Sequence, residues 1–176
     1  MPFAHDTQAA LESAVHLANT ALEPDTLTSL GDLGEFFDGF GYTGDRPNET
    51  DLEPVRGIRR QLHDLLVSTR DEAVPLVNGI LSDAHALPQL VRHGDADWHI
   101  HATTDHRPLA ERILVETAMA MIDMIRADEM SRFDRCTNDD CEGIVLDLSR
   151  NRSRLYCSTA CTNRAAAAAY RARRAE

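Results

Sequence analysis

The sequence predicts a mainly α (α+β) protein built from two parts. Before residue 131, apolar residues recur at helical spacing in five stretches, and one further stretch alternates as a β-hairpin does. All four cysteines follow residue 135, in two close pairs. We therefore expect a helical N-terminal domain with a small β-hairpin, residues 1–131. A small C-terminal module, residues 132–176, should follow and need a metal because it is too short to build a core.

The N-terminal domain is expected to contain five helices. The first follows Thr7, a residue type that caps helix N-termini. His16 and Asn19, three residues apart on this helix, are expected on the surface or in packing contacts. The five predicted helices span residues 7–22, 27–40, 50–68, 71–85 and 107–130.

The longest of these helices, residues 107–130, is apolar on most sides and is expected at the centre of the core. Glu116 and Asp123 interrupt its apolar run, which is too short to cross a membrane. Its methionines fit ordinary core packing, with an adaptable pocket or a dimer seam as the alternative; they are Met119, Met121 and Met124.

Two other patterns in this domain favour ordinary explanations. Residues 39–44 match G-x-G-x-x-G, but they follow a helix and run into a loop, so we expect a turn and not a nucleotide site. Basic side chains on the helix at 50–68 could receive an anionic ligand, but the many nearby acids favour ion pairs; they are Arg56, Arg59, Arg60 and His63.

Residues 87–93 and 97–103 predict a small β-hairpin around a Gly-Asp pair. Strand alternation places His99 and His101 on one face. With His106 they form H-x-H-x4-H, which fits a second metal site or a pH-sensitive site. Exposed strand histidines are the commoner outcome, and both interpretations stay open.

The cysteines form a C-x4-C-x15-C-x3-C pattern at Cys136, Cys141, Cys157 and Cys161. Two close pairs with such a spacer suit one tetrahedral Zn²⁺, because each pair supplies adjacent ligands. Four cysteines leave no open position for water or substrate, so the expected Zn²⁺ is structural and not catalytic.

Two other interpretations of these cysteines are disulfides and unrelated thiols. Disulfides need an oxidising compartment, but the N-terminus shows no secretory signal, so we expect a cytoplasmic protein. Unrelated thiols should be scattered, whereas the four cysteines are confined to 26 residues. That confinement favours a shared ligand.

The C-terminal module can be followed along the chain. Residues 144–148 form a β-prone run, residues 149–153 a polar turn, and residues 155–156 the start of a return strand. Ser158 is an N-cap candidate before an alanine-rich helix. A knuckle, a hairpin and a helix in this order predict a treble-clef-like zinc finger.

The charge of the chain is unevenly distributed. The segment from Ser149 to Glu176 has a formal charge of +6, against −14 for residues 1–131. Arginine binds phosphate bidentately and can read guanine, so a basic tip on an acidic chain favours DNA contact. The candidate contacts, mostly to phosphate, are Arg150, Arg152, Arg154, Asn163, Arg164, Arg171 and Arg174. Alternatively, the arginines solubilise the helix and neutralise the zinc tetrathiolate, and Asn163 bonds the hairpin backbone.

Residues 146–164, LDLSRNRSRLYCSTACTNR, resemble the CGNR zinc finger, a bacterial family with the pattern D-x-S-R-N-x-S-R-x-W-C-s-x-x-x-C-G-N-R. Upstream, SAVHLANT at residues 13–20 is similar to the F-x-N-T opening of the mainly helical ABATE domain, which precedes this finger. The resemblance implies a stress-induced transcription regulator whose finger is the DNA-binding element.

Two residues depart from the finger pattern. Tyr156 stands where Trp is usual, a mild change between large aromatic side chains. Thr162 replaces the Gly of the name motif, and its Cβ narrows the room for another backbone. Metal binding is expected to survive this change, while its effect on DNA contact is left open.

The expected function is a zinc-dependent DNA-binding transcriptional regulator. Its N-terminal domain would sense a small-molecule effector or form a homodimer. No nucleophile elbow, independent Cys-His pair or P-loop is present in the sequence, so we expect no enzyme. We expect no membrane partner, because the longest apolar run is too short to cross a bilayer. The alternatives are a zinc-stabilised protein-interaction module without DNA binding and, third, a metabolic enzyme with a structural finger attached.

Overall fold

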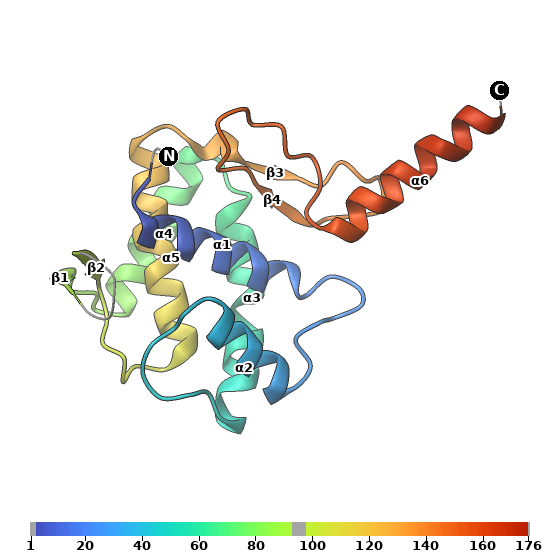
Figure 1. Cartoon of the computed structure of the whole chain (residues 1–176). Coiled ribbons are helices and arrows are strands. Elements are labelled where there is room, and N and C mark those ends of the chain that lie inside the picture. The colour runs from blue at the N-terminus through green and yellow to red at the C-terminus, as the bar shows by residue number, and fades with distance from the viewer. Residues whose placement is uncertain (1–2, 93–97, 176) are drawn as a thin grey trace.

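The computed structural model describes residues 3–92 and 98–175 of the 176-residue chain. Helices α1 to α5 form a body, β3 and β4 lie on one side of it, and α6 projects away from it toward the C-terminus (Figure 1). The elements are α1 (His5–Asn19), α2 (Leu30–Gly39), α3 (Glu49–Leu66), α4 (Arg70–Asp83), β1 (Gln89–Val91), β2 (His99–His101), α5 (Leu109–Arg126), η1 (Met130–Arg132), β3 (Phe133–Arg135), β4 (Ile144–Leu146) and α6 (Thr159–Ala175). The predicted mainly α fold with small hairpins is confirmed.

Side-chain caps fix where three of the helices begin. Ser29, Asn48 and Thr69 each accept a hydrogen bond from a backbone amide in the first turn of α2, α3 and α4. In each case an acidic side chain three residues later bonds back to the cap residue's amide, which completes a capping box. The predicted cap at Thr7 is wrong: α1 begins at His5, and the Thr7 hydroxyl donates to Asp123 Oδ2 of α5 at 2.7 Å.

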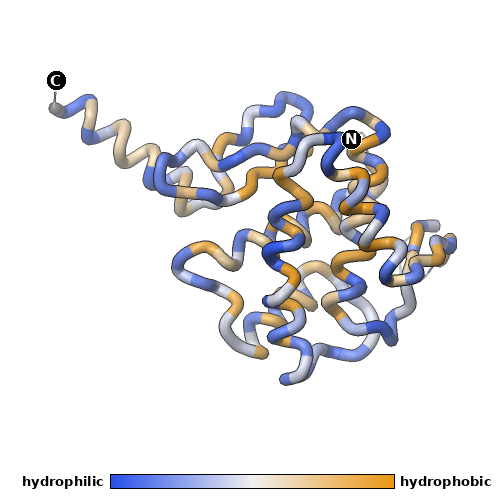
Figure 2. Tube along the Cα trace, turned by 180° about the vertical axis from the view of Figure 1, so that it is seen from behind, coloured by the Kyte–Doolittle hydropathy of each residue, from blue (hydrophilic) through white to orange (hydrophobic). Residues whose placement is uncertain are grey.

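Helix α5 lies at the centre of the body, as its apolar sequence predicts. It packs against α1, α3 and α4, and its Met121 and Met124 side chains are fully buried. Met119 packs against the same core, so ordinary core packing of the methionines is confirmed. Figure 2 shows hydrophobic positions recurring along the helices of the body, whereas the projecting part of α6 has none as strongly hydrophobic.

The glycine-rich turn and the arginine cluster behave as expected. Gly39 ends α2, and Gly41 and Gly44 adopt positive φ angles in the turn and loop that follow it, so this segment is a turn as expected. A Cβ on Gly44 would lie 2.8 Å from the backbone oxygen of Asp105, which explains the need for glycine there. On α3, Arg59 holds Asp25 with two hydrogen bonds of 2.8 and 2.9 Å, and Arg56, Arg60 and His63 also lie beside carboxylates.

Each of the two hairpins consists of three-residue strands. Strand β1 pairs antiparallel with β2, with Leu90 opposite Ile100. The predicted Gly94-Asp95 turn between them lies outside the described residues. Strand β3 pairs antiparallel with β4, with Phe133 opposite Leu146.

The second hairpin corrects the predicted finger. Residues 155–156 do not form the expected return strand. Strand β4 pairs instead with β3, which precedes it in the chain. The Leu155 carbonyl instead accepts a hydrogen bond of 3.0 Å from the Thr137 amide, so this segment runs beside the first cysteine knuckle. Both Ile144 and Leu146 are buried, which leaves β4 flanked by the body and β3.

Candidate metal centre

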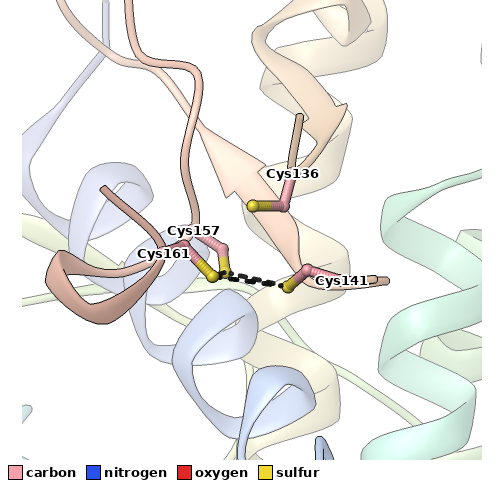
Figure 3. A group of neighbouring side chains, drawn as sticks. All are labelled: Cys136, Cys141, Cys157 and Cys161. Atoms are coloured by element: carbon pink, nitrogen blue, oxygen red, sulfur yellow. Dashed lines mark hydrogen bonds between the residues drawn. The ribbon is translucent and has the colours of Figure 1, made fainter. Parts of the chain in front are cut away.

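The four cysteines converge on one point, although they come from two separate segments (Figure 3). The Sγ atoms of Cys141, Cys157 and Cys161 lie 3.6 Å from one another, and all four Sγ atoms lie within 4.8 Å. Sulfurs bound to one tetrahedral zinc at ~2.3 Å lie about 3.8 Å apart. These distances are far too long for disulfides, and all four cysteines are free thiols.

Backbone contacts hold each cysteine pair in place. Cys136 follows β3, and its amide donates to the Gly143 carbonyl at 2.8 Å. Gly143 lies tightly against the second pair, because a Cβ at this position would lie 2.7 Å from Cys157 Sγ. At the start of α6, the Ser158 hydroxyl accepts a hydrogen bond of 3.2 Å from the Cys161 amide, which confirms Ser158 as the cap.

The environment of the sulfurs favours a bound cation. Burial raises the pKa of the Cys141 and Cys157 thiols, and neighbouring thiols add to the rise at Cys157. Burial also disfavours ionisation of Cys161, but hydrogen bonds from Arg164, Asn138 and Ser158 outweigh it and lower the pKa of that thiol to about 6. A divalent ion among the sulfurs supplies the positive charge that four clustered thiolates require.

Two family models match the chain, one for each part. The model of the ABATE domain, described as "putative stress-induced transcription regulator", matches residues 11–128. The chain belongs to the ABATE family. The model of the CGNR zinc finger matches residues 132–174 of this ABATE protein. This matched segment contains all four cysteines. The converging sulfurs and the zinc-finger match together make this centre a structural zinc site.

A search of curated proteins gives no match. Among the helices of residues 3–92 and 98–175, none combines the length and the apolar character needed to cross a bilayer.

Three of the predicted DNA-contact arginines are held by the protein itself. The Arg164 guanidinium donates to Cys161 Sγ at 2.9 Å, Arg152 pairs with Glu129, and Arg154 Nη1 donates to the Leu146 carbonyl at 3.3 Å. Charge patterning alone does not distinguish a guanidinium that faces solvent from one that has a partner within the chain. Arg164 therefore supports the metal centre, whatever else it contacts.

The other candidate contacts lie on the surface. Asn163 and Arg171 are exposed on α6, and Arg150 is exposed on the loop before it. Arg174, near the C-terminus, lies over the Tyr170 ring with 5.8 Å between the guanidinium carbon and the ring centroid. Within the described residues, Arg150 and Arg171 have no ion pair.

Several residues around the finger were not predicted to be functional. The Asp147 carboxylate accepts from the amides of Ser149 and Arg154 at 2.8 and 2.6 Å, so it closes the loop between them. Hydrogen bonding by the Ser149 side chain, followed by that of the two amides, lowers the pKa of Asp147. Asn138 Nδ2 donates to the Cys161 carbonyl at 2.9 Å and joins the two cysteine pairs. Asp147 could have been identified from its place as the first residue of the D-x-S-R-N pattern. No sequence pattern indicates the role of Asn138.

The site of three histidines, one of the two interpretations that the sequence leaves open, does not form among the described residues. In the part of the chain that the structure describes, the cysteines are the one group of three or more ligand side chains close enough to share an ion. His99 and His101 do lie together, with 3.1 Å between their Nε2 atoms, but His106 does not join them.

Proposed function

We propose that this ABATE protein is a zinc-dependent DNA-binding transcription regulator that contacts the duplex through α6 and the loop at 149–154. The observation that carries the proposal is α6 itself. This helix of 17 residues projects from the body, is exposed from Thr162 to Arg174 apart from Ala165, and holds four arginines and no acid (Figure 1). An α-helix fits the major groove of B-DNA, and arginine is the residue best suited to phosphate and guanine there.

The loop beside the finger adds a second basic surface. A groove of about 840 Å³ lies between α1 and residues 147–154, and four arginines line it: Arg132, Arg150, Arg152 and Arg154. Arg132 is buried and donates to the carbonyls of Asp147 and Ser149 at 3.0 and 3.2 Å, so it fixes the loop. Among these arginines, Arg150 is the one best placed to reach a phosphate.

The proposal is tested by DNA-binding titrations of zinc-loaded protein at several salt concentrations. Binding to about three to five phosphates gives a slope of log K against log salt of about −3 to −4.5. The double variant Arg171→Glu with Arg174→Glu should weaken binding at least tenfold. The single variants Arg171→Glu and Arg173→Glu form the matched pair, because each makes the same charge change on a different face of α6, and Arg173→Glu should cost less.

The competing function is a zinc-stabilised protein-interaction module. Two exposed apolar side chains near the finger favour it, Leu155 at 53% exposure and Tyr170 at 54%. This alternative predicts no salt-dependent DNA binding at low ionic strength. Such a result with fully zinc-loaded protein would replace the DNA-binding proposal.

The remaining parts of the proposal concern the N-terminal domain. We propose that the protein is not an enzyme, and that its zinc, bound by four cysteines with no open coordination position, has a structural role. A small-molecule effector or a homodimer stays a prediction from the sequence. A cavity of about 550 Å³ between the end of α4 and the β1–β2 hairpin gives the effector a place to bind.

A further inference from the structure

Strand β2 brings two imidazole rings together far from the cysteines in sequence. His99 and His101 are two residues apart, so they lie on the same face of the strand. Both side chains are half-buried, their ring centroids are 4.9 Å apart, and their Nε2 atoms are 3.1 Å apart. Two ring nitrogens thus converge on one point.

The spacing of these nitrogens fits two ligands of one metal ion. Metal–imidazole bonds are ~2.0–2.1 Å long, so ligand angles between 90° and 109° place the two nitrogens about 2.9 to 3.4 Å apart. We propose that His99 and His101 form a second metal site, which chelates a divalent transition metal ion such as Ni²⁺ or Cu²⁺. Imidazole nitrogen is a preferred ligand of these ions.

In the absence of metal, the two rings can share a hydrogen bond across the same 3.1 Å. One neutral ring donates its N–H to the lone pair of the other. On metal binding, the donating ring loses its Nε2 proton to solvent and takes one up from solvent at Nδ1, so both rings stay neutral and both Nε2 lone pairs face the ion.

The surroundings of the pair allow an ion to enter. His101 lines the cavity of about 550 Å³, together with Gln89, which is its partner across the strand pair. Among the described residues, no third histidine, cysteine or carboxylate completes the set. With these two imidazoles as its ligands, the ion should exchange more readily than the zinc held by four cysteines.

The backbone of β2 is held on both sides, which keeps the histidines in position. One side pairs with β1, and on the other the Ile100 amide donates to Asp6 Oδ2 in the first turn of α1 at 3.2 Å. Because the strand is fixed before the metal arrives, little ordering is needed on binding.

The test is a calorimetric titration of tag-free protein that already contains one zinc per chain. Ni²⁺ should bind at one further site per chain. His99→Gln and His101→Gln should each weaken that binding at least tenfold, whereas His106→Gln, the nearby exposed histidine, should leave it unchanged. Zinc content is measured alongside and should stay constant in all variants.

A second measurement needs no substitution. Paramagnetic Ni²⁺ added to the wild-type protein should first broaden the imidazole proton signals of His99 and His101 in NMR spectra, before those of His106. Wild-type protein that binds no Ni²⁺, or variants at His99 and His101 that bind it as the wild type does, would overturn the proposal. Because neither readout involves DNA, failure here is distinct from failure of the DNA-binding proposal.

Discussion

Asn19, at the end of α1, forms two hydrogen bonds with the backbone of Ile144 in β4. Its Nδ2 donates to the Ile144 carbonyl and its Oδ1 accepts from the Ile144 amide, each at 2.8 Å. One side chain of the ABATE domain thereby supplies hydrogen-bond partners to the edge of β4 that faces away from β3. The finger and the helical body are joined through this contact.

Replacement of this side chain should weaken the junction. Asn19→Ala leaves the amide and carbonyl of buried Ile144 unpaired, at a cost of about 1–3 kcal/mol. The free energy of unfolding should fall by that amount in urea titrations, and hydrogen exchange at the Ile144 amide should accelerate. Asn78→Ala, on the exposed face of α4, is the matched control, and an equal loss in both variants would contradict the role of Asn19.

Arg164 should affect zinc retention before it affects anything else. Its guanidinium donates to Cys161 Sγ, and loss of such a partner to a metal ligand typically costs 10- to 100-fold in metal affinity. We expect Arg164→Gln to bind zinc about tenfold more weakly in competition with a chelator, while Arg171→Gln binds it normally. Equal zinc affinity in the two variants would show that the Arg164 contact is not needed by the metal.

Asp147 should hold the loop at 149–154 in its observed conformation. An asparagine can accept at one position only, and its NH₂ group would face one of the two amides that the carboxylate now accepts from. Asp147→Asn should therefore cost about 1.5–3 kcal/mol of stability. Faster amide exchange of Ser149 and Arg154 would identify the loop as the cause, and unchanged exchange there would refute it.

Glu116 of α5 should make stability depend on pH near neutrality. Burial raises the pKa of its carboxyl group to about 7; Arg112 opposes this rise and Asp105 adds to it. The folded protein therefore holds more protons than the unfolded chain between pH 4.5 and about 7, so stability falls as pH rises through this window.

Glu116→Gln removes that dependence. The free energy of unfolding of the wild type minus that of the variant should decrease from pH 5 to pH 7, as measured by urea titration. Glu49→Gln, at an exposed position, provides the control difference, which should stay constant. A constant difference for Glu116→Gln as well would mean that its carboxyl group has an ordinary pKa.

The helices could be predicted because their signals are local. Apolar periodicity located all five helices of the body, with ends that differ by a few residues, and α5 was expected at the centre. The ends themselves depend on particular side chains: Ser29, Asn48 and Thr69 form capping boxes, while Thr7 is used for a contact between helices.

The finger shows where local signals are insufficient. Strand β4 was located, but its partner was not, because β3 and residues 155–156 are both short and the choice depends on tertiary contacts. The cysteine spacing was enough to predict one shared site. The contact between Asn19 and Ile144 spans 125 positions of the sequence, and no pattern in either segment indicates it.

The central claim is that one zinc ion, bound by four cysteine sulfurs, orders the finger and thereby presents α6. The most direct test combines metal analysis with X-ray absorption spectroscopy at the zinc edge on purified protein. We predict one zinc per chain, surrounded by four sulfurs at about 2.3 Å. Protein without bound metal, or a zinc shell containing nitrogen or oxygen in place of any of the four sulfurs, would contradict the account.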